Sequence, residues 1–249
     1  MVGIQPHIKC RPGDVAELVF LVGDPGRIKL IAKHLESPRE VANNRGLPVW
    51  NGMYKNIPVS VASTGMGCPS AAIVVEELAN IGAKTFIRIG TCGGLKEGIR
   101  AGDLIIPTEA ICEDGTTKEY VGSDFRAVAD PGLVAALEGA AKNKNFQYWK
   151  GVNRTHDAFY ELLENFLKLE NHPMDPVSSE MECSIVFTIA LLRGLRAAAV
   201  LNVNTVEPPE KVRENPEIVY ELSEAPETTG GIERAIEVAL EAGASLQRH

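Results

Sequence analysis

Several features that define common protein classes are missing from this chain of 249 residues. Its longest apolar stretches, such as Ile185 to Leu192, fall well short of the roughly 20 residues that a membrane-spanning helix requires. The N-terminus lacks the basic segment and apolar core of a secretion signal. No linker rich in proline, glycine and serine divides the chain. We therefore expect one cytoplasmic domain over residues 1–249 with no membrane partner.

Cysteine usage and charge exclude further classes. The five cysteines are widely spread, form no CxxC pair and show no histidine spacing suited to zinc, so we expect neither a disulfide scaffold nor a metal site. The formal net charge of -8 argues against a nucleic acid partner, because binding to a polynucleotide depends on clustered cations. A small anionic ligand can still be held by a few arginines beside glycines.

The first motif, Gly23-Asp24-Pro25-Gly26-Arg27, follows an apolar strand at Leu18–Val22 and opens a segment, Ile28 to Leu35, with helical spacing. Glycines let backbone N–H groups face an anion, the start of a helix adds a positive dipole, and Arg27 adds a full charge. The motif alone is equally consistent with a tight turn that binds nothing.

Two further glycine-rich segments follow strands. Ser63-Thr64-Gly65-Met66-Gly67 precedes an amphipathic helix at Ala71 to Ile81. It differs from a dinucleotide fingerprint because Ser70 replaces the third glycine and no acidic residue follows at the required distance. The next strand, from Lys84, contains Arg88 within an apolar run. A buried unpaired charge is unfavourable, so Arg88 needs an anionic partner, either a ligand or a structural carboxylate.

The rest of the chain alternates strand and helix patterns, which predicts an α/β fold with a mixed central sheet. A hairpin turn is expected at Lys55-Asn56. The polar stretch from Glu207 to Glu227 is too long for a turn and favours a lid. Further strands are expected at 39–44, 47–54, 57–62, 103–112, 147–153 and 195–203, and further helices at 131–144, 157–169, 178–192 and 231–247.

Two segments offer side chains for a ligand or for the core. Phe159 and Tyr160 stand at a strand-to-helix junction, where they could stack on a planar base or pack inside. The segment Glu180-Met181-Glu182 follows two serines, which suggests a capped helix start. Because Glu182 stands one step from a buried apolar run, its carboxylate requires hydrogen-bond donors.

In combination, order and spacing, these motifs resemble the nucleoside phosphorylase family, its uridine phosphorylase branch most closely. The resemblance spans the chain from His7 to about Val206. It implies a three-layer α/β/α fold and a hexamer built from dimers with shared active sites. It also implies phosphorolysis, in which inorganic phosphate attacks C1′ of a nucleoside and releases the base and ribose 1-phosphate. Phosphate is then a co-substrate, and no cofactor is expected.

The resemblance also implies roles for single residues. Arg88 and Glu182 are implied as catalytic, because a fixed phosphate and a carboxylate on the ribose would stabilise an oxocarbenium-like transition state. The implied phosphate ligands are Gly23, Arg27, Arg88 and Thr91, with Arg45 from the neighbouring subunit. The implied ribose ligands are Met181, Glu182 and, across the dimer, His7. The implied base contacts are Phe159, Leu163 and Asn165.

The base site departs from both branches of the family. The uridine branch has a glutamine and an arginine where this chain has Leu163 and Asn165, and a second arginine where it has Thr205. The purine branch has an aspartic acid that protonates the base, whereas Asn204 cannot act as an acid. Glu207 is the nearest carboxylate in the sequence.

These departures leave alternatives open. A purine nucleoside phosphorylase fits the same phosphate and ribose motifs, and so does a nucleoside-binding protein with altered base chemistry. A hydrolytic nucleosidase would have little need of the three arginines. Gly46 replaces a carboxylate that binds a monovalent ion between subunits in some relatives, so we predict no such ion.

Overall fold

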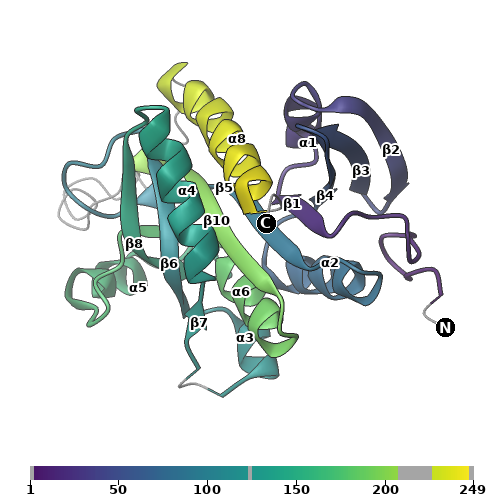
Figure 1. Cartoon of the computed structure of the whole chain (residues 1–249). Helices are drawn as coiled ribbons and strands as arrows, with labels where there is room; N and C mark the ends of the chain where they lie inside the picture. Colours follow the sequence, from purple (N-terminus) through teal and green to yellow (C-terminus); the bar gives the residue numbers. More distant parts are fainter. Residues whose placement is uncertain (1–2, 123–124, 207–225, 247–249) are drawn as a thin grey trace.

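A computed structural model describes residues 3–122, 125–206 and 226–246 of the chain (Figure 1). The described residues contribute ten strands to one mixed sheet. The strands are β1 (Leu18–Val22), β2 (Glu36–Asn44), β3 (Leu47–Tyr54), β4 (Ile57–Ser63), β5 (Thr85–Gly94), β6 (Leu104–Cys112), β7 (Ala127–Val128), β8 (Tyr148–Thr155), β9 (Ser178–Glu180) and β10 (Arg196–Val206).

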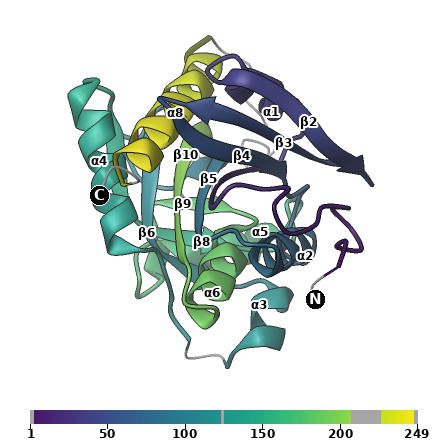
Figure 2. The ribbon, with the colours of Figure 1, turned by 45° about the vertical axis from the view of Figure 1, so that its right-hand side comes forward.

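Helices cover both faces of this sheet. Figures 1 and 2 show α4 and α8 side by side on one face and α2, α3 and α6 on the other, which confirms the expected three layers. The helices are α1 (Gly26–Ala32), α2 (Cys68–Asn80), α3 (Gly115–Tyr120), α4 (Pro131–Asn143), α5 (Leu163–Leu167), α6 (Cys183–Leu192) and α8 (Pro226–Leu246), with a 3₁₀ turn, η1 (Lys168–Asn171).

Strand β5 organises the sheet. It runs parallel to β1 on one side and to β10 on the other, and β1 is also parallel to β4. The path from β10 through β6, β8 and β9 returns to β5, so this part of the sheet closes on itself. Because β1, β4 and β5 are parallel, the glycine-rich segments after or within them meet at one edge, where open α/β sheets bind ligands.

The buried strands explain this arrangement. All five residues of β1 are buried, and an apolar strand of this kind needs cover on both faces. Gly90 permits a close approach within β5. A Cβ at this position would lie 2.7 Å from Cδ2 of Leu201 on β10 and 3.0 Å from Cζ of Arg88. The missing side chain therefore leaves room for the guanidinium of Arg88 beside its own strand.

Most predicted elements are confirmed, with shifted ends. The hairpin turn at Lys55 and Asn56 has positive φ angles of 51° and 66°, as a tight hairpin requires. Helix α2 begins three residues earlier than expected, since Gly67 at φ 84° starts it and Pro69 occupies its first turn. Helix α8 begins before the expected residue 231. Residues 207–225, which include most of the expected lid and Glu207, lie outside the described residues.

The prediction of a helix over 157–169 is wrong for its first half. The backbone is irregular until α5 begins at Leu163. Tertiary contacts hold this part: Asp157 accepts the N–H of Gly115 at 2.8 Å, and Glu161 accepts two bonds from Arg154 at 2.6 and 2.8 Å. The helical apolar spacing therefore gave way to polar contacts with distant segments.

The predicted serine cap before α6 is also wrong. Ser178 and Ser179 belong to β9, which pairs with β5 and β8. The carboxylate of Glu180 instead accepts the N–H of Cys183, the first residue of α6, at 3.0 Å. The serines therefore do not cap the helix, whereas a capping role for Glu180, which the sequence pattern also allowed, is confirmed.

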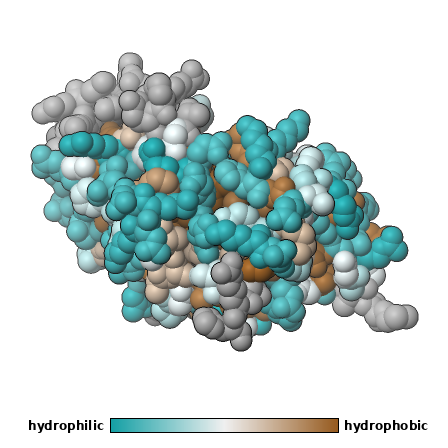
Figure 3. All heavy atoms as spheres, turned by 45° about the horizontal axis from the view of Figure 1, so that its top comes forward, coloured by the Kyte–Doolittle hydropathy of each residue, from teal (hydrophilic) through white to brown (hydrophobic). Residues whose placement is uncertain are grey.

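Hydrophilic residues cover most of the face in Figure 3, with hydrophobic ones in smaller areas between them. Within the described part of the chain, no helix has both the length and the apolar character that crossing a membrane demands.

We expect Asp130 to anchor α4. Its Oδ1 accepts the N–H of Leu133 at 2.8 Å and a bond from Nη2 of Arg196 at 3.0 Å. Asp130→Ala should lower the free energy of unfolding by about 1 kcal/mol in urea denaturation, whereas Asp130→Asn, which keeps a capping oxygen, should retain most of it. An alanine variant as stable as the parent would contradict this role.

Candidate functional site

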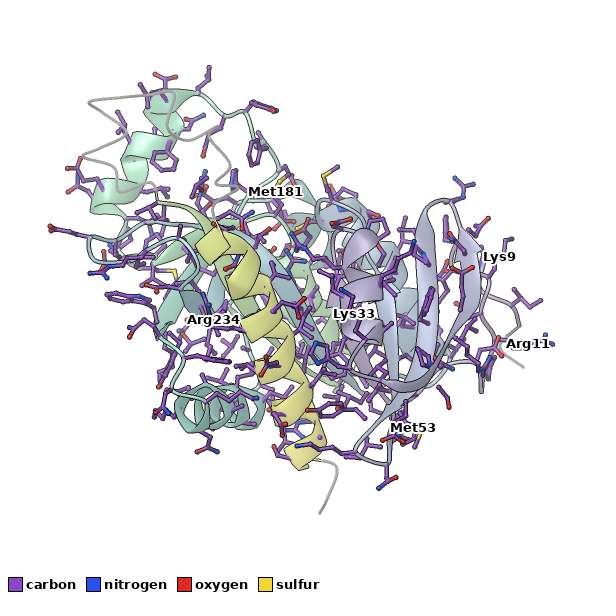
Figure 4. The ribbon with its side chains drawn as sticks, turned by 90° about the horizontal axis from the view of Figure 1, so that it is seen from above. Lys9, Arg11, Lys33, Met53, Met181 and Arg234 are labelled. Atoms are coloured by element: carbon purple, nitrogen blue, oxygen red, sulfur yellow. The ribbon has the colours of Figure 1, made fainter. Side chains whose placement is uncertain are left out.

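A cavity of about 640 Å³ opens at the carboxyl ends of β1 and β5. It is also lined by the start of α1, the turn after β4, the segment after β8, the end of β9 and the end of β10. In Figure 4, Met181 lies between the part of the chain that carries α5 and the part that carries α1. One cavity therefore collects residues from all the glycine-rich segments.

Arg88 is the central charge of this cavity. Its side chain is 4% exposed and lies between two carboxylates. Its Nε donates to Oε2 of Glu180 at 3.2 Å, and its Nη2 donates to Glu182. Although burial lowers the pKa of Arg88, Glu182 and Glu180 raise it above the ordinary value. The guanidinium is therefore a permanent cation, as the sequence required.

Two guanidinium groups, those of Arg27 and Arg88, line one end of the cavity, which we call the anion end. Arg27, from α1, donates its Nη2 to Oγ1 of Thr91 at 3.3 Å. Burial and, next, the charge of Arg88 lower the pKa of Arg27, whereas Asp24 and Glu182 raise it. Nη1 of Arg88 is buried and has no hydrogen-bond partner among the described residues. Two cations that destabilise each other, one with a donor to spare, favour an anion between them.

The start of α1 contributes less than the sequence suggested. Asp24 Oδ1 accepts the N–H of Gly26 at 2.8 Å, so this amide at the helix start is already bonded within the protein. Gly23 lines the cavity, and a Cβ there would lie 3.9 Å from Nη1 of Arg88. The motif thus contributes the Arg27 side chain and, at Gly23, a backbone that lies close to Arg88. Asp24 partly neutralises the positive end of the helix dipole.

Glu180 holds the segment that carries the other ligands. Its buried carboxylate accepts bonds from Asn153 Nδ2 at 2.8 Å, from Thr155 Oγ1 at 2.7 Å and from the N–H of Glu182 at 2.8 Å. Together with Arg88 these donors satisfy the charge, which burial would otherwise make costly. Glu180 therefore fixes both the turn at Met181 and the orientation of Arg88.

Glu182 is buried where a carboxylate is unusual. Oε1 accepts the N–H of Gly67 at 2.5 Å, and Oε2 accepts from Arg88. Burial, with Glu180, raises the pKa of Glu182 above its ordinary value, although Arg88 and the N–H of Gly67 lower it. Each carboxylate oxygen has two lone pairs, so these contacts leave acceptor capacity toward the cavity.

The opposite end of the cavity combines rings with polar groups. Phe159 is 40% exposed and meets Tyr160 edge to face, with ring centroids 5.0 Å apart. Leu163 and Phe166 of α5 also line this end, as do Asn204 and Thr205 of β10. A flat apolar ligand group fits such a surface, since a ring face can pack on Phe159.

His156 and Glu161 add polar chemistry there. Nδ1 of His156 lies 3.9 Å from Oε1 of Glu161, which is paired with Arg154. Burial and, next, the charge of Arg154 lower the pKa of His156. The carboxylates of Glu161, Glu180 and Glu113 raise it by less. The imidazole is therefore neutral at pH 7. Sequence reasoning missed both residues, because neither belongs to a motif and the contact depends on the irregular 157–162 backbone.

The structure brings together eight of the residues that the sequence pointed to. Those that line the cavity are Gly23, Arg27, Arg88, Thr91, Phe159, Leu163, Met181 and Glu182. Cys92, Gly93 and Ser179 also line it without having been assigned a role. The signal for these three was their position beside predicted residues on β5 and β9.

Three predicted site residues lie outside this lining. Asn165, on α5, accepts a bond from Lys168 Nζ at 2.8 Å and does not line the cavity, so its contact with a base stays a prediction. Nδ1 of His7 lies 2.6 Å from Oε1 of Glu77. Arg45 is exposed at the turn between β2 and β3, with φ 56°. The last two were expected to act in a neighbouring subunit.

Ligand atoms of Cys68, Asp114 and Asp157 lie within 4.8 Å of one another. The aspartates accept hydrogen bonds from Thr117 and Gly115, and burial, then Asp114, raises the pKa of Cys68. Because a metal binds the thiolate, a thiol held protonated makes a poor ligand.

Comparisons with known proteins show which family the chain resembles. The family model described as the phosphorylase superfamily matches residues 17–228. A uridine phosphorylase of Thermococcus kodakarensis is 41% identical over 213 residues, 81% of this chain and 77% of its own length. A guanosine phosphorylase of Halorubrum lacusprofundi is 37% identical over 244 residues, 97% of this chain and 99% of its own. The crystal structure of uridine phosphorylase from Vibrio fischeri is similar with a TM-score of 0.85 and 32% identity, covering 97% of both chains.

Arg27 should contribute directly to anion binding. Arg27→Gln should weaken the binding of inorganic phosphate, measured by calorimetry, by roughly 10- to 100-fold, because it removes a charge-assisted donor. Lys29→Gln is the matched control, since it removes the same charge from an exposed position on the same helix. Equal phosphate affinity in Arg27→Gln and the parent would contradict the assignment.

Proposed function

The chain belongs to the phosphorylase superfamily, and we propose that it is a nucleoside phosphorylase of the uridine phosphorylase type. In this reaction an oxygen of inorganic phosphate attacks C1′ of a ribonucleoside, the glycosidic bond to the base breaks, and ribose 1-phosphate and free base are formed. The observation that carries the proposal is the pair Arg27 and Arg88 in one cavity with Glu182 and Phe159.

The cationic side chains bind the phosphate, and the carboxylate of Glu182 binds the ribose. Arg27, Arg88 and Thr91 hold the phosphate and orient one oxygen toward C1′, which turns a bimolecular attack into one within a complex. Glu182 accepts hydrogen bonds from ribose hydroxyls through its remaining lone pairs. As the bond to the base breaks, positive charge develops on the ribose, and Glu182 stabilises it electrostatically. Phosphate is the nucleophile, so no covalent bond to the enzyme is needed.

A charge count supports shared sites between subunits. Around the anion end, the cations Arg27 and Arg88 face the carboxylates Glu180 and Glu182. Asp24, beside Arg27, adds a third carboxylate, so the charges are already unbalanced toward the negative before a phosphate dianion binds. We propose that Arg45 from a second subunit supplies the missing cation, that His7 enters the same site, and that dimers of this kind form a hexamer.

The location and the co-substrates follow the same reasoning. None of the five cysteines, all of them among the described residues, takes part in a disulfide. A reducing compartment keeps thiols in this state, which supports our proposal of a cytoplasmic enzyme. We propose that phosphate and nucleoside are sufficient for turnover, with no cofactor.

The decisive experiment is phosphate dependence. Purified protein incubated with uridine should release uracil only when phosphate is present, with one ribose 1-phosphate formed for each uracil by chromatography. Release that continues unchanged without phosphate would indicate a hydrolase instead. No base release from uridine, inosine, guanosine or adenosine would contradict the proposal, and faster turnover of the purine nucleosides would favour the second candidate, which the similarity to a guanosine phosphorylase supports.

Subunit sharing can be tested by complementation. Arg45→Ala and Glu182→Gln should each be nearly inactive, but a mixed dimer restores one site, because the two residues of that site come from different subunits. Random reassembly of equal amounts should recover about a quarter of the parent activity. Arg27→Gln mixed with Glu182→Gln is the control, since both residues lie in the same subunit's cavity and cannot complement. A mixture no more active than its components would contradict shared sites.

A further inference from the structure

His156 and Glu161 form a polar pair at the end of the cavity that carries Phe159, which we call the base end. Their arrangement suggests which edge of a base this end accepts. His156 and Glu161 both line the cavity, and both side chains are largely buried, 14% and 12% exposed. They come from the short segment that links β8 to α5. Neither occupies one of the positions that the family resemblance assigned to the base.

The separation between them is informative. The 3.9 Å between Nδ1 of His156 and Oε1 of Glu161 is too long for a direct hydrogen bond. Nδ1 is buried without a hydrogen-bond partner within residues 3–122, 125–206 and 226–246. A buried donor or acceptor left in this state is unfavourable, so a ligand group that pairs with it gains binding energy. Both residues line the cavity, and 3.9 Å is a separation at which two atoms can pair with neighbouring atoms of one ligand edge once the imidazole turns Nδ1 toward the ligand.

The hydrogen on His156 can be assigned from its neighbours. A carboxylate such as Glu161 can only accept hydrogen bonds, so a lone pair on Nδ1 facing it would be repelled. Nδ1 therefore carries the hydrogen and is the donor. Glu161 keeps its charge through Arg154, which donates to Oε1 at 2.6 Å and to Oε2 at 2.8 Å. The cavity thus presents one donor beside one acceptor.

We propose that His156 and Glu161 select bases with a lactam edge, a carbonyl oxygen next to a ring N–H, with His156 donating to the carbonyl and Glu161 accepting from the N–H. This inference rests on the proposed function for its view that the cavity holds a nucleoside. Uracil, hypoxanthine and guanine carry such an edge. Cytosine and adenine carry an amino group next to an unprotonated ring nitrogen.

The edge of cytosine and adenine is unfavourable at both Nδ1 of His156 and Oε1 of Glu161. An amino group would place its hydrogens against the N–H of His156, and the ring nitrogen would turn its lone pair toward the carboxylate of Glu161. Both buried groups would lose their partners, which is the situation in which polar sites discriminate most strongly. The pair contacts only this edge, so it can accept a pyrimidine and a purine that share it.

Calorimetry of nucleoside binding without phosphate tests this directly, because no turnover is required. Inosine against adenosine and uridine against cytidine are matched pairs that differ only at this edge. The parent protein should bind the lactam member of each pair at least roughly tenfold more tightly. Glu161→Gln, whose amide can serve either pattern, and His156→Leu, which removes the donor, should each reduce this ratio by at least roughly threefold.

The controls separate this inference from the proposed reaction. Glu164→Gln changes an exposed carboxylate on α5 outside the cavity and should leave the ratio unchanged. A parent ratio near one, a ratio unaffected by both Glu161→Gln and His156→Leu, or no binding of any of the four nucleosides would overturn the inference. Selective binding without phosphate-dependent base release would support the inference while contradicting the proposed reaction.

Discussion

The ion cluster of Arg88 with Glu180 and Glu182 is the constraint on which the rest of this site depends. Replacing such buried charges with apolar groups often stabilises a protein, so their retention is weak support for a purely structural role. Here the cluster does more than balance charge. Glu180 binds the backbone at Glu182 and at the start of α6, so the orientation of the cation and the path of the chain are fixed together. A ligand therefore meets a donor and an acceptor that are already in place.

Local chemistry made much of the fold predictable. The turn at Lys55-Asn56, the apolar strand β1 and helix α4 each follow from neighbouring residues, and the structure contains all three. The segment from Asp157 to Leu162 could not be read in this way. Its helical spacing competes with hydrogen bonds to Gly115 and Arg154, which are distant in sequence or lie on β8, and these contacts decide its conformation.

The candidate site was predictable to different depths at its two ends. Arg88 stood out because a charge within an apolar strand must have a partner, and Glu182 because a carboxylate beside a buried helix must have donors. Both conclusions need only one residue and its neighbours. His156 and Glu161 carry no such signal, since their importance comes from a distance across an irregular backbone. Asn165 lies outside the cavity lining, because its position in the pattern did not specify which face of α5 it would occupy.

This difference has a structural cause with consequences for function. The anion end is carried by β5, by β9 and by the turn after β1, where sheet hydrogen bonds and the buried ion cluster hold each group. The base end is carried largely by a connection between strand and helix, and such segments tolerate change because fewer packed contacts constrain them. A protein built this way can keep the arginine-lined end of its cavity while the end near Phe159 is altered. The chain is similar to both a uridine phosphorylase and a guanosine phosphorylase, two names that share the word phosphorylase and differ in the nucleoside, and that division leads us to expect this.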